Sequence, residues 1–204
     1  MLFRSRGLGI DIDQAKIEKA RANGYEACRF DILKLPDSKL VRFVTMSHFL
    51  EHLDSIAVAK KMIDKSISVS DDFVIIRQPW FDADGMLFEL GFKFYWSHWG
   101  GHRNRMSSLD FHSILSAELR AGRIQGFAIF GRGEVTDSSH PSILPIGAPI
   151  DQHEYSEKLH GPKASQRLPT RIFKEIVVRM DVGGGNSADI MMNHLSPVQL
   201  LYRV

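Results

Sequence analysis

Apolar and polar positions along the chain follow two periods, and together they predict strands separated by helices. Short runs of apolar and β-branched residues, typical of strands, occupy 9–13, 26–30, 41–46, 73–77, 124–130 and 172–180. Strong helix formers fill 14–22, and apolar residues recur at helical spacing over 54–68 and 107–119. Helices between consecutive strands favour a parallel α/β sheet whose strands end at one common edge.

Polar residues follow three of these strands at that edge. Asp11 and Asp31 end the first two strands, and the segment from Ser47 to His52 follows the third. A carboxylate at such a strand end can accept hydrogen bonds from the hydroxyls of a ribose. We therefore expect these residues and Gln78-Pro79 to converge on one ligand. The alternatives are an ordinary strand-end acid at Asp11 and an Asx turn at Asp31.

Two later segments depart from the alternating pattern. Residues 79–106 hold all three tryptophans and many other aromatic residues, and we predict an aromatic, lid-like insertion with a short helix over 83–90. Residues 132–171 are rich in Pro, Ser and Gly and read as one long loop. We expect a single domain over 1–182 and a flexible C-terminal tail over 183–204, which opens with three glycines.

Composition narrows the class of protein. The chain has 204 residues, of which 44% are hydrophobic, so it can bury one well-formed core. A net charge of +2 without a dense basic block gives no evidence for a nucleic-acid partner. A single cysteine, Cys28, fits a reducing compartment, and no apolar run approaches the roughly 18 residues of a membrane span. We expect a cytoplasmic protein without a membrane partner.

The motifs, taken in order, resemble a known family over residues 7 to 181. The segments that carry the resemblance are Gly9-Ile10-Asp11-Ile12-Asp13, Arg29-Phe30-Asp31-Ile32 with Leu35-Pro36, Met46-Ser47-His48-Phe49-Leu50-Glu51-His52-Leu53, and the His/Arg-rich run before the 107–119 helix. They are similar to the class I S-adenosylmethionine-dependent methyltransferases, in particular to the group whose motif reads Ser-His-x-Leu-Glu-His. The resemblance implies a Rossmann-like, mostly parallel sheet with a C-terminal antiparallel hairpin, formed by the strands over 124–130 and 172–180.

The resemblance also implies a cofactor site for S-adenosylmethionine. Asp11 would accept hydrogen bonds from the ribose hydroxyls, and Asp31 would accept one from the adenine amino group. His48, near the reactive methyl group, is the candidate catalytic base. The full set of implied cofactor-binding residues is Asp11, Ile12, Asp31, Ile32, Ser47 and His48.

Residues of the aromatic segment are candidates for binding the methyl acceptor. The basic residues there could bind an anionic acceptor, and the aromatic ones could line its pocket. The alternatives are core packing for the aromatic residues and a polar rim for the basic ones. The candidates are Tyr95, Trp96, His98, His102 and Arg103.

Histidine spacing raises the question of a metal site. His48 and His52 are four residues apart, and so are His98 and His102. No cysteine joins them, and the order of residues is not that of a metalloprotease. We predict no metal site.

One part of the family pattern has no counterpart here. The first strand and the glycine-rich turn of the family do not precede Asp11, so the fold reads as N-terminally truncated. A second copy or a partner chain could complete the open sheet edge. The leading prediction is methyl transfer to a small molecule or metabolite. The alternatives are a non-catalytic, methyltransferase-like binding module or truncated inactive homologue, and a nicotinamide-dependent oxidoreductase.

Overall fold

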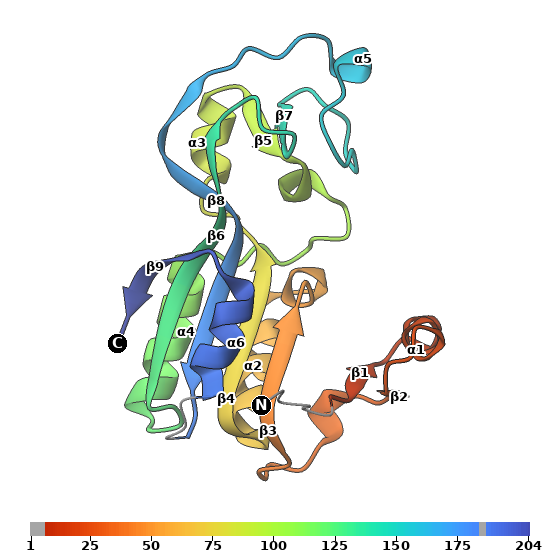
Figure 1. The fold of residues 1–204 in the computed structure, drawn as a ribbon, viewed down its shortest axis with the longest axis vertical. Helices are drawn as coiled ribbons and strands as arrows, with labels where there is room; N and C mark the ends of the chain where they lie inside the picture. Colours follow the sequence, from red (N-terminus) through yellow and green to blue (C-terminus); the bar gives the residue numbers. More distant parts are fainter. Residues whose placement is uncertain (1–6, 184–186) are drawn as a thin grey trace.

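The centre of the molecule is a mixed five-stranded sheet (Figure 1). The computed structural model describes residues 7–183 and 187–204. The strand order is β3-β4-β8-β6-β9, where β3 and β4 are parallel and the other neighbours antiparallel. The strands are β3 (Val41–Ser47), β4 (Ser70–Pro79), β8 (Arg167–Asp181), β6 (Gly126–Asp137) and β9 (Val198–Arg203). The antiparallel pairing of β6 with β8 confirms the predicted C-terminal hairpin.

Helices cover both faces of this sheet. Side chains of α2 (Ile56–Val69) and α4 (Ser108–Arg120) join the main core with Val74 and Ile76 of β4. Phe73 and Ile75 point to the opposite face, where they pack with α6 (Ser187–Leu195). Successive residues of a strand face opposite ways, so the continuous apolar run in β4 reflects burial on both sides.

The predicted helices begin where the sequence places caps. The Ser55 hydroxyl accepts a hydrogen bond from the Val58 N–H at the start of α2. At the start of α4, Ser107 and Asp110 form a capping box. Ser, Thr and Asp at these positions satisfy N–H groups that have no partner within the helix.

The C-terminal segment differs from the expected tail. It contains α6 and β9, and β9 extends the sheet by pairing with β6. This regular structure depends on a long-range effect, because Ala188 and Met192 cover a sheet face formed by distant residues. The flexibility expected of the segment stays a prediction. The glycines at 184 and 185 lie outside the described residues.

The aromatic segment and the long connection form one lobe, at the top of Figure 1. The aromatic segment supplies α3 (Asp84–Glu89), β5 (Phe92–Phe94) and η3 (Tyr95–His98), and the connection supplies β7 (Ile143–Pro145) and α5 (Glu157–His160). Strand β5 pairs with β7. The short helix is confirmed. The single loop over 132–171 is wrong, because β6 continues to Asp137 and β8 starts at Arg167.

The first strands do not join the main sheet. β1 (Gly9–Asp11) and β2 (Ala27–Arg29) form a separate parallel pair, connected by α1 (Gln14–Ala22), and η1 (Ile32–Lys34) follows. Figure 1 shows this unit beside β3, at the lower right. The expectation of one continuous sheet is wrong, because within the described residues nothing pairs with β1 on the side away from β2.

Apolar side chains are exposed on β1, on β3 and on residues next to these strands. β3 is an edge strand, and most of its residues are exposed or half-buried, whereas those of β4 are mostly buried. The exposed apolar residues of this region are Leu8, Ile10, Ile12, Leu40 and Val41. Separately, no helix within residues 7–183 and 187–204 is long and apolar enough to cross a membrane.

Candidate functional site at the carboxyl ends of β3 and β4

The Ser-His-x-Leu-Glu-His motif forms a tight turn at the carboxyl end of β3. The N–H of His48 donates to the carbonyl of Arg77 at 2.8 Å, which continues the ladder between β3 and β4. His48 has a φ of 49°, a left-handed conformation that non-glycine residues rarely adopt. Leu50 is buried in the core, and η2 (Leu50–His52) follows. The backbone therefore turns sharply and places His48 at the edge of the sheet.

Two carboxylates hold His48. Its Nε2 lies 3.0 Å from Glu175 Oε1, and its Nδ1 lies 3.4 Å from Glu51 Oε1. The hydrogen bonds with Glu175 and Glu51 raise the pKa of His48 to about 9, against the opposing effect of burial. Arg77 Nη2 also lies 3.1 Å from His48 Nε2. Both groups carry protons, so we interpret them as sharing the Glu175 acceptor rather than bonding to each other.

Glu175 is the centre of this charged cluster. Its Oε2 accepts from Arg132 at 2.6 Å, and its Oε1 lies 3.2 Å from Arg77 Nε. Burial alone would raise the pKa of Glu175, but His48, Arg132 and Arg77 outweigh it and hold this pKa at about 2. Sequence reasoning missed Glu175, Arg132 and Arg77. The sequence held two signals for them: Glu175 is a lone acid inside the apolar run of β8, and Arg77 is an arginine inside the apolar run of β4.

Glu51, His52 and His102 lie next to this cluster. The His52 and His102 rings meet edge to face with centroids 5.0 Å apart. Burial lowers the pKa of His102, against the hydrogen bond to the Trp96 carbonyl. Arg103, the next residue, forms an exposed ion pair with Asp54 at 2.7 Å.

The other acceptor candidates lie in the upper lobe. Trp96 is only 4% exposed, stacks on Phe94 with centroids 4.2 Å apart, and donates from Nε1 to the Trp80 carbonyl. The alternative reading of Trp96 as a core residue fits this placement. Tyr95 is half-buried, with its ring 5.4 Å from that of His153.

His98 also belongs to this lobe. Its Nδ1 lies 2.8 Å from Nζ of the buried Lys93, whose ammonium also donates to the Ala148 carbonyl. Burial lowers the pKa of both His98 and Lys93. The structure thus separates His98 from His102, which lies against the β3 turn.

The two strand-end acids make local turns. Asp11 Oδ1 accepts from the Asp13 N–H at 2.8 Å, and Asp11 Oδ2 lies 3.7 Å from Lys16 Nζ. Asp31 Oδ1 accepts from the Leu33 N–H at 3.0 Å, which confirms the Asx turn there. Ile12 is exposed and Ile32 is half-buried.

The expected convergence of all strand ends does not occur. Asp11, Ile12, Asp31 and Ile32 belong to the β1–β2 unit, whereas Ser47 and His48 belong to the main sheet. The physical reason is that β1 and β3 are not paired in the described residues. The carboxyl ends of the strands therefore do not form one continuous sheet edge. The cofactor roles of these residues stay predictions.

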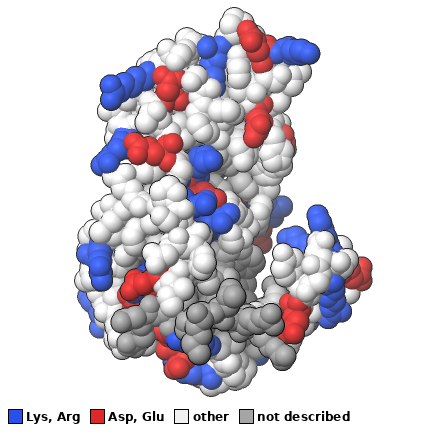
Figure 2. Space-filling model, in the orientation of Figure 1, with Lys and Arg blue, Asp and Glu red and all other residues white. Residues whose placement is uncertain are grey.

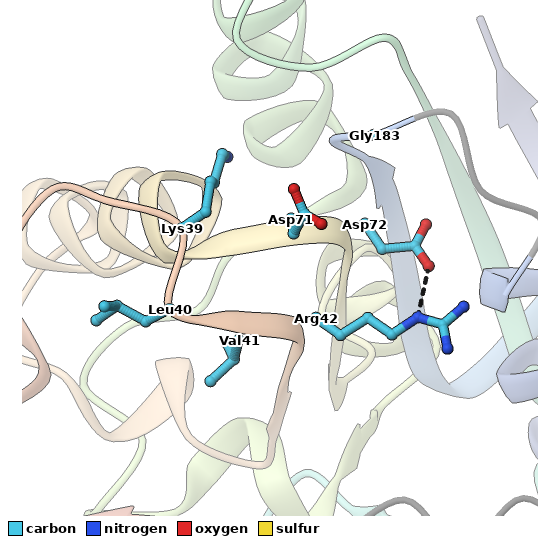
Figure 3. A pocket seen from close by; sticks show the side chains of 7 residues that line it. All are labelled: Lys39, Leu40, Val41, Arg42, Asp71, Asp72 and Gly183. Carbon is cyan, nitrogen blue, oxygen red and sulfur yellow. Dashed lines mark hydrogen bonds and ion pairs between the residues drawn. The ribbon is translucent and has the colours of Figure 1, made fainter.

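A surface hollow lies at the opposite end of the strands (Figure 3). It has a volume of about 730 Å³, and its walls are formed by the amino ends of β3 and β4 together with Gly183. Arg42 and Asp72, joined at 3.2 Å, lie on one side of it. Ligands of open α/β sheets bind at the carboxyl ends of the strands, so we place the candidate site at the His48 end and not here.

The face of the molecule drawn in Figure 2 carries charges of both signs. Lys and Arg side chains are interspersed with Asp and Glu over this face of the molecule. Acidic and basic atoms also meet at the waist between the upper lobe and the sheet.

The fold is similar to that of solved structures. No protein-family model and no curated protein matches the chain. A solved "SAM-dependent methyltransferase, possible histamine N-methyltransferase" from Thermotoga maritima superposes with a TM-score of 0.50 at 14% identity, over 85% of this chain and 72% of that one. A SAM-dependent methyltransferase from Archaeoglobus fulgidus gives 0.50 at 19% identity, over 85% and 75%. The chain has a methyltransferase-like fold.

This methyltransferase-like fold confirms the α/β class expected from the motifs. In it, the His48 cluster lies at the carboxyl ends of β3 and β4, where ligands of such sheets bind. The likeness concerns the fold, while the Ser-His-x-Leu-Glu-His group itself stays a prediction.

Proposed function

We propose that the chain binds S-adenosylmethionine and transfers its methyl group to a small molecule. The observation that carries this proposal is the methyltransferase-like fold, shared over 85% of the chain with two structures described as SAM-dependent methyltransferases. The ordered motifs at the strand ends support it. Their acids have the chemistry that the hydroxyl and amino donors of adenosine require.

The residues of β1 and β2 fit the adenosine part of the cofactor. Each of Asp11 and Asp31 uses one carboxylate oxygen in a local turn, and a carboxylate can accept further hydrogen bonds on its second oxygen. The ion pair of Asp11 with Lys16 spans 3.7 Å and involves an exposed lysine, so a ribose could displace it at low cost.

The arrangement of β1 and β3 fits the cofactor less well, because the described residues place the two strands in separate sheets. We propose that an additional strand, from a second copy or a partner chain, pairs with the edge of β3 when the cofactor binds. Two features support this proposal: the edge of β3, which no described strand pairs with on its outer side, and the exposed apolar side chains of β1 and β3, such as Ile10 and Val41. An unpaired, apolar edge favours association with another strand.

Bound S-adenosylmethionine would supply an electrophilic methyl group for in-line displacement. The protein then has to orient the acceptor and exclude water. With a pKa of about 9, His48 is protonated near neutral pH and has no lone pair with which to accept a proton. We therefore favour a positioning role for His48, which holds Glu51 and Glu175 at the site, over the predicted role of catalytic base.

Calorimetric titration with S-adenosylhomocysteine tests the cofactor proposal. The variant Asp11→Ala should bind about 1 to 3 kcal/mol more weakly, the value of one or two hydrogen bonds to a charged group. Glu18→Ala, at an exposed position of α1, is the matched control and should bind like the unchanged chain. Equal affinity of Asp11→Ala and the control would remove Asp11 from the site.

A non-catalytic, methyltransferase-like binding module is the second candidate function. The exposed apolar residues of β1 and β3 favour it, because exposed apolar surface marks interaction sites. The two candidates differ in the same titration with S-adenosylhomocysteine. Heat of binding supports the enzyme, whereas no heat at millimolar ligand supports the module. Adding NADH to a parallel titration tests the oxidoreductase alternative.

A further inference from the structure

Three potential metal ligands meet where η2 contacts the segment that follows η3. One ligand atom from each of Glu51, His52 and His102 lies within 4.8 Å of the other two. This set differs from the four histidines that the spacing suggested. His48 is held by carboxylates, and His98 contacts Lys93 in the upper lobe.

Backbone carbonyls orient the His52 and His102 rings through the same ring nitrogen, Nδ1. His52 Nδ1 lies 3.1 Å from the Gly101 carbonyl oxygen, and His102 Nδ1 lies 2.8 Å from the Trp96 carbonyl oxygen. A carbonyl oxygen only accepts, so Nδ1 carries the proton in each ring, and in the neutral ring Nε2 keeps its lone pair. This arrangement, in which a backbone carbonyl orients the imidazole through the nitrogen that does not bind, is typical of metal-ligating histidines.

Glu51 brings a buried carboxylate oxygen to the site. Its side chain is 1% exposed, and its Oε2 has no hydrogen-bond partner among the residues that the structure describes. Its other oxygen lies 3.4 Å from His48 Nδ1. An unpaired buried carboxylate oxygen is costly, and a cation beside Oε2 would remove that cost.

The backbone around these ligands is held together by Asn104. The Asn104 N–H donates to the Glu51 carbonyl at 3.2 Å, and its Nδ2 donates to the Leu50 carbonyl at 3.0 Å. Asn104 is 2% exposed. These two bonds, with that between His52 and Gly101, fasten the segment carrying His102 to the turn that carries Glu51. The backbone that carries the ligands is therefore in place before any ion arrives.

From this geometry we propose that Glu51, His52 and His102 bind one divalent first-row transition-metal ion, of the class of Zn²⁺ and Fe²⁺. Two imidazoles and one carboxylate suit these metals, whereas Mg²⁺ and Ca²⁺ prefer oxygen ligands. Ligands about 2.1 Å from a tetrahedral ion lie about 3.4 Å apart, so the site must contract slightly on binding. The exposed His52 side chain can move to achieve this. Three protein ligands leave a coordination position for water or an oxygen of another ligand.

Titration of the tag-free protein with Co²⁺, followed by its visible absorption and by displacement with Zn²⁺, tests the site. The unchanged chain should bind one equivalent. His52→Ala, His102→Ala and Glu51→Gln should each weaken binding at least about tenfold. The matched control is His194→Ala, at an exposed histidine of α6, which should bind like the unchanged chain.

Two outcomes would overturn the proposal. One is the absence of a one-to-one complex with the unchanged chain at micromolar protein, and the other is equal affinity of His52→Ala and the control. Because His52 is exposed, its replacement should leave the fold intact even if Glu51→Gln does not fold. The measurement needs no cofactor, so failure to bind S-adenosylhomocysteine would leave this result unaffected.

Discussion

Replacement of Glu175 by glutamine should change how the stability of the protein depends on pH. Glu175 lies between Arg77, Arg132 and His48, with its side chain 13% exposed. The variant Glu175→Gln keeps the shape of the side chain but removes its charge. It therefore isolates the contribution of the ionised carboxylate to the free energy of unfolding.

The size of the effect follows from the pKa of Glu175. Burial opposes ionisation, but His48 and the two arginines lower the pKa from 4.5 to about 2. Each pKa unit corresponds to about 1.36 kcal/mol, so the ionised carboxylate stabilises the fold by about 3 kcal/mol at neutral pH. Because the folded-state pKa is the lower one, this stabilisation is present above pH 4.5 and is lost as the pH falls through 2. About 2 kcal/mol of it should be lost between pH 7 and pH 3.

Urea unfolding at a series of pH values between 3 and 7 measures this difference. The gap in unfolding free energy between the unchanged chain and Glu175→Gln should be largest near pH 7 and shrink toward pH 3. Glu134→Gln, at an exposed position of β6, is the control and should show no such trend. A gap that stays constant over this range would refute the reasoning. It would mean that the Glu175 carboxylate does not gain from its cationic neighbours.

The same variant gives a second readout through His48. Its hydrogen bond with Glu175 is the largest cause of its raised pKa, so Glu175→Gln should lower the pKa of His48 from about 9. Proton NMR of the imidazole, recorded with a metal chelator present, measures this value. A midpoint near 9 in both proteins would contradict the contact. The two pKa changes describe one interaction, so their energies are not added.

Two further predictions concern packing and buried hydrogen bonds. Gly131→Ala should destabilise the protein by about 1 to 3 kcal/mol, because a Cβ there would lie 2.4 Å from the Phe173 ring. Gly147→Ala, where a Cβ would meet nothing within 4 Å, should be nearly neutral, and similar thermal midpoints for the two variants would contradict this. Asn104→Ala should cost about 1 to 3 kcal/mol in urea unfolding, because it removes a buried hydrogen bond to the Leu50 carbonyl, which keeps only the Leu53 N–H as a donor. It should also weaken Co²⁺ binding, and an unchanged affinity would show that Asn104 does not organise the site.

Local sequence patterns determined most of the regular structure. The apolar spacing of Ala59, Ile63 and Ile67 determined α2, because those residues repeat once per helical turn. The continuous apolar run of β4 indicated a strand covered on both faces, and the structure confirms this cover. The capping residues Asp13 and Ser107 marked where helices begin. Each of these effects acts between residues a few positions apart.

Tertiary structure alone decided how these pieces meet. The β1–β2 unit carries the expected strands and acids, but which strand lies beside β3 depends on pairing that no local pattern encodes. The last helix and strand owe their place to a sheet face and an edge formed by distant residues. The candidate site also depends on the packing of distant segments, since His48 and Glu175 are 127 positions apart in the chain. The sequence determined which groups the protein has, whereas the packing of distant segments decided that Glu51, His52 and His102 would lie together.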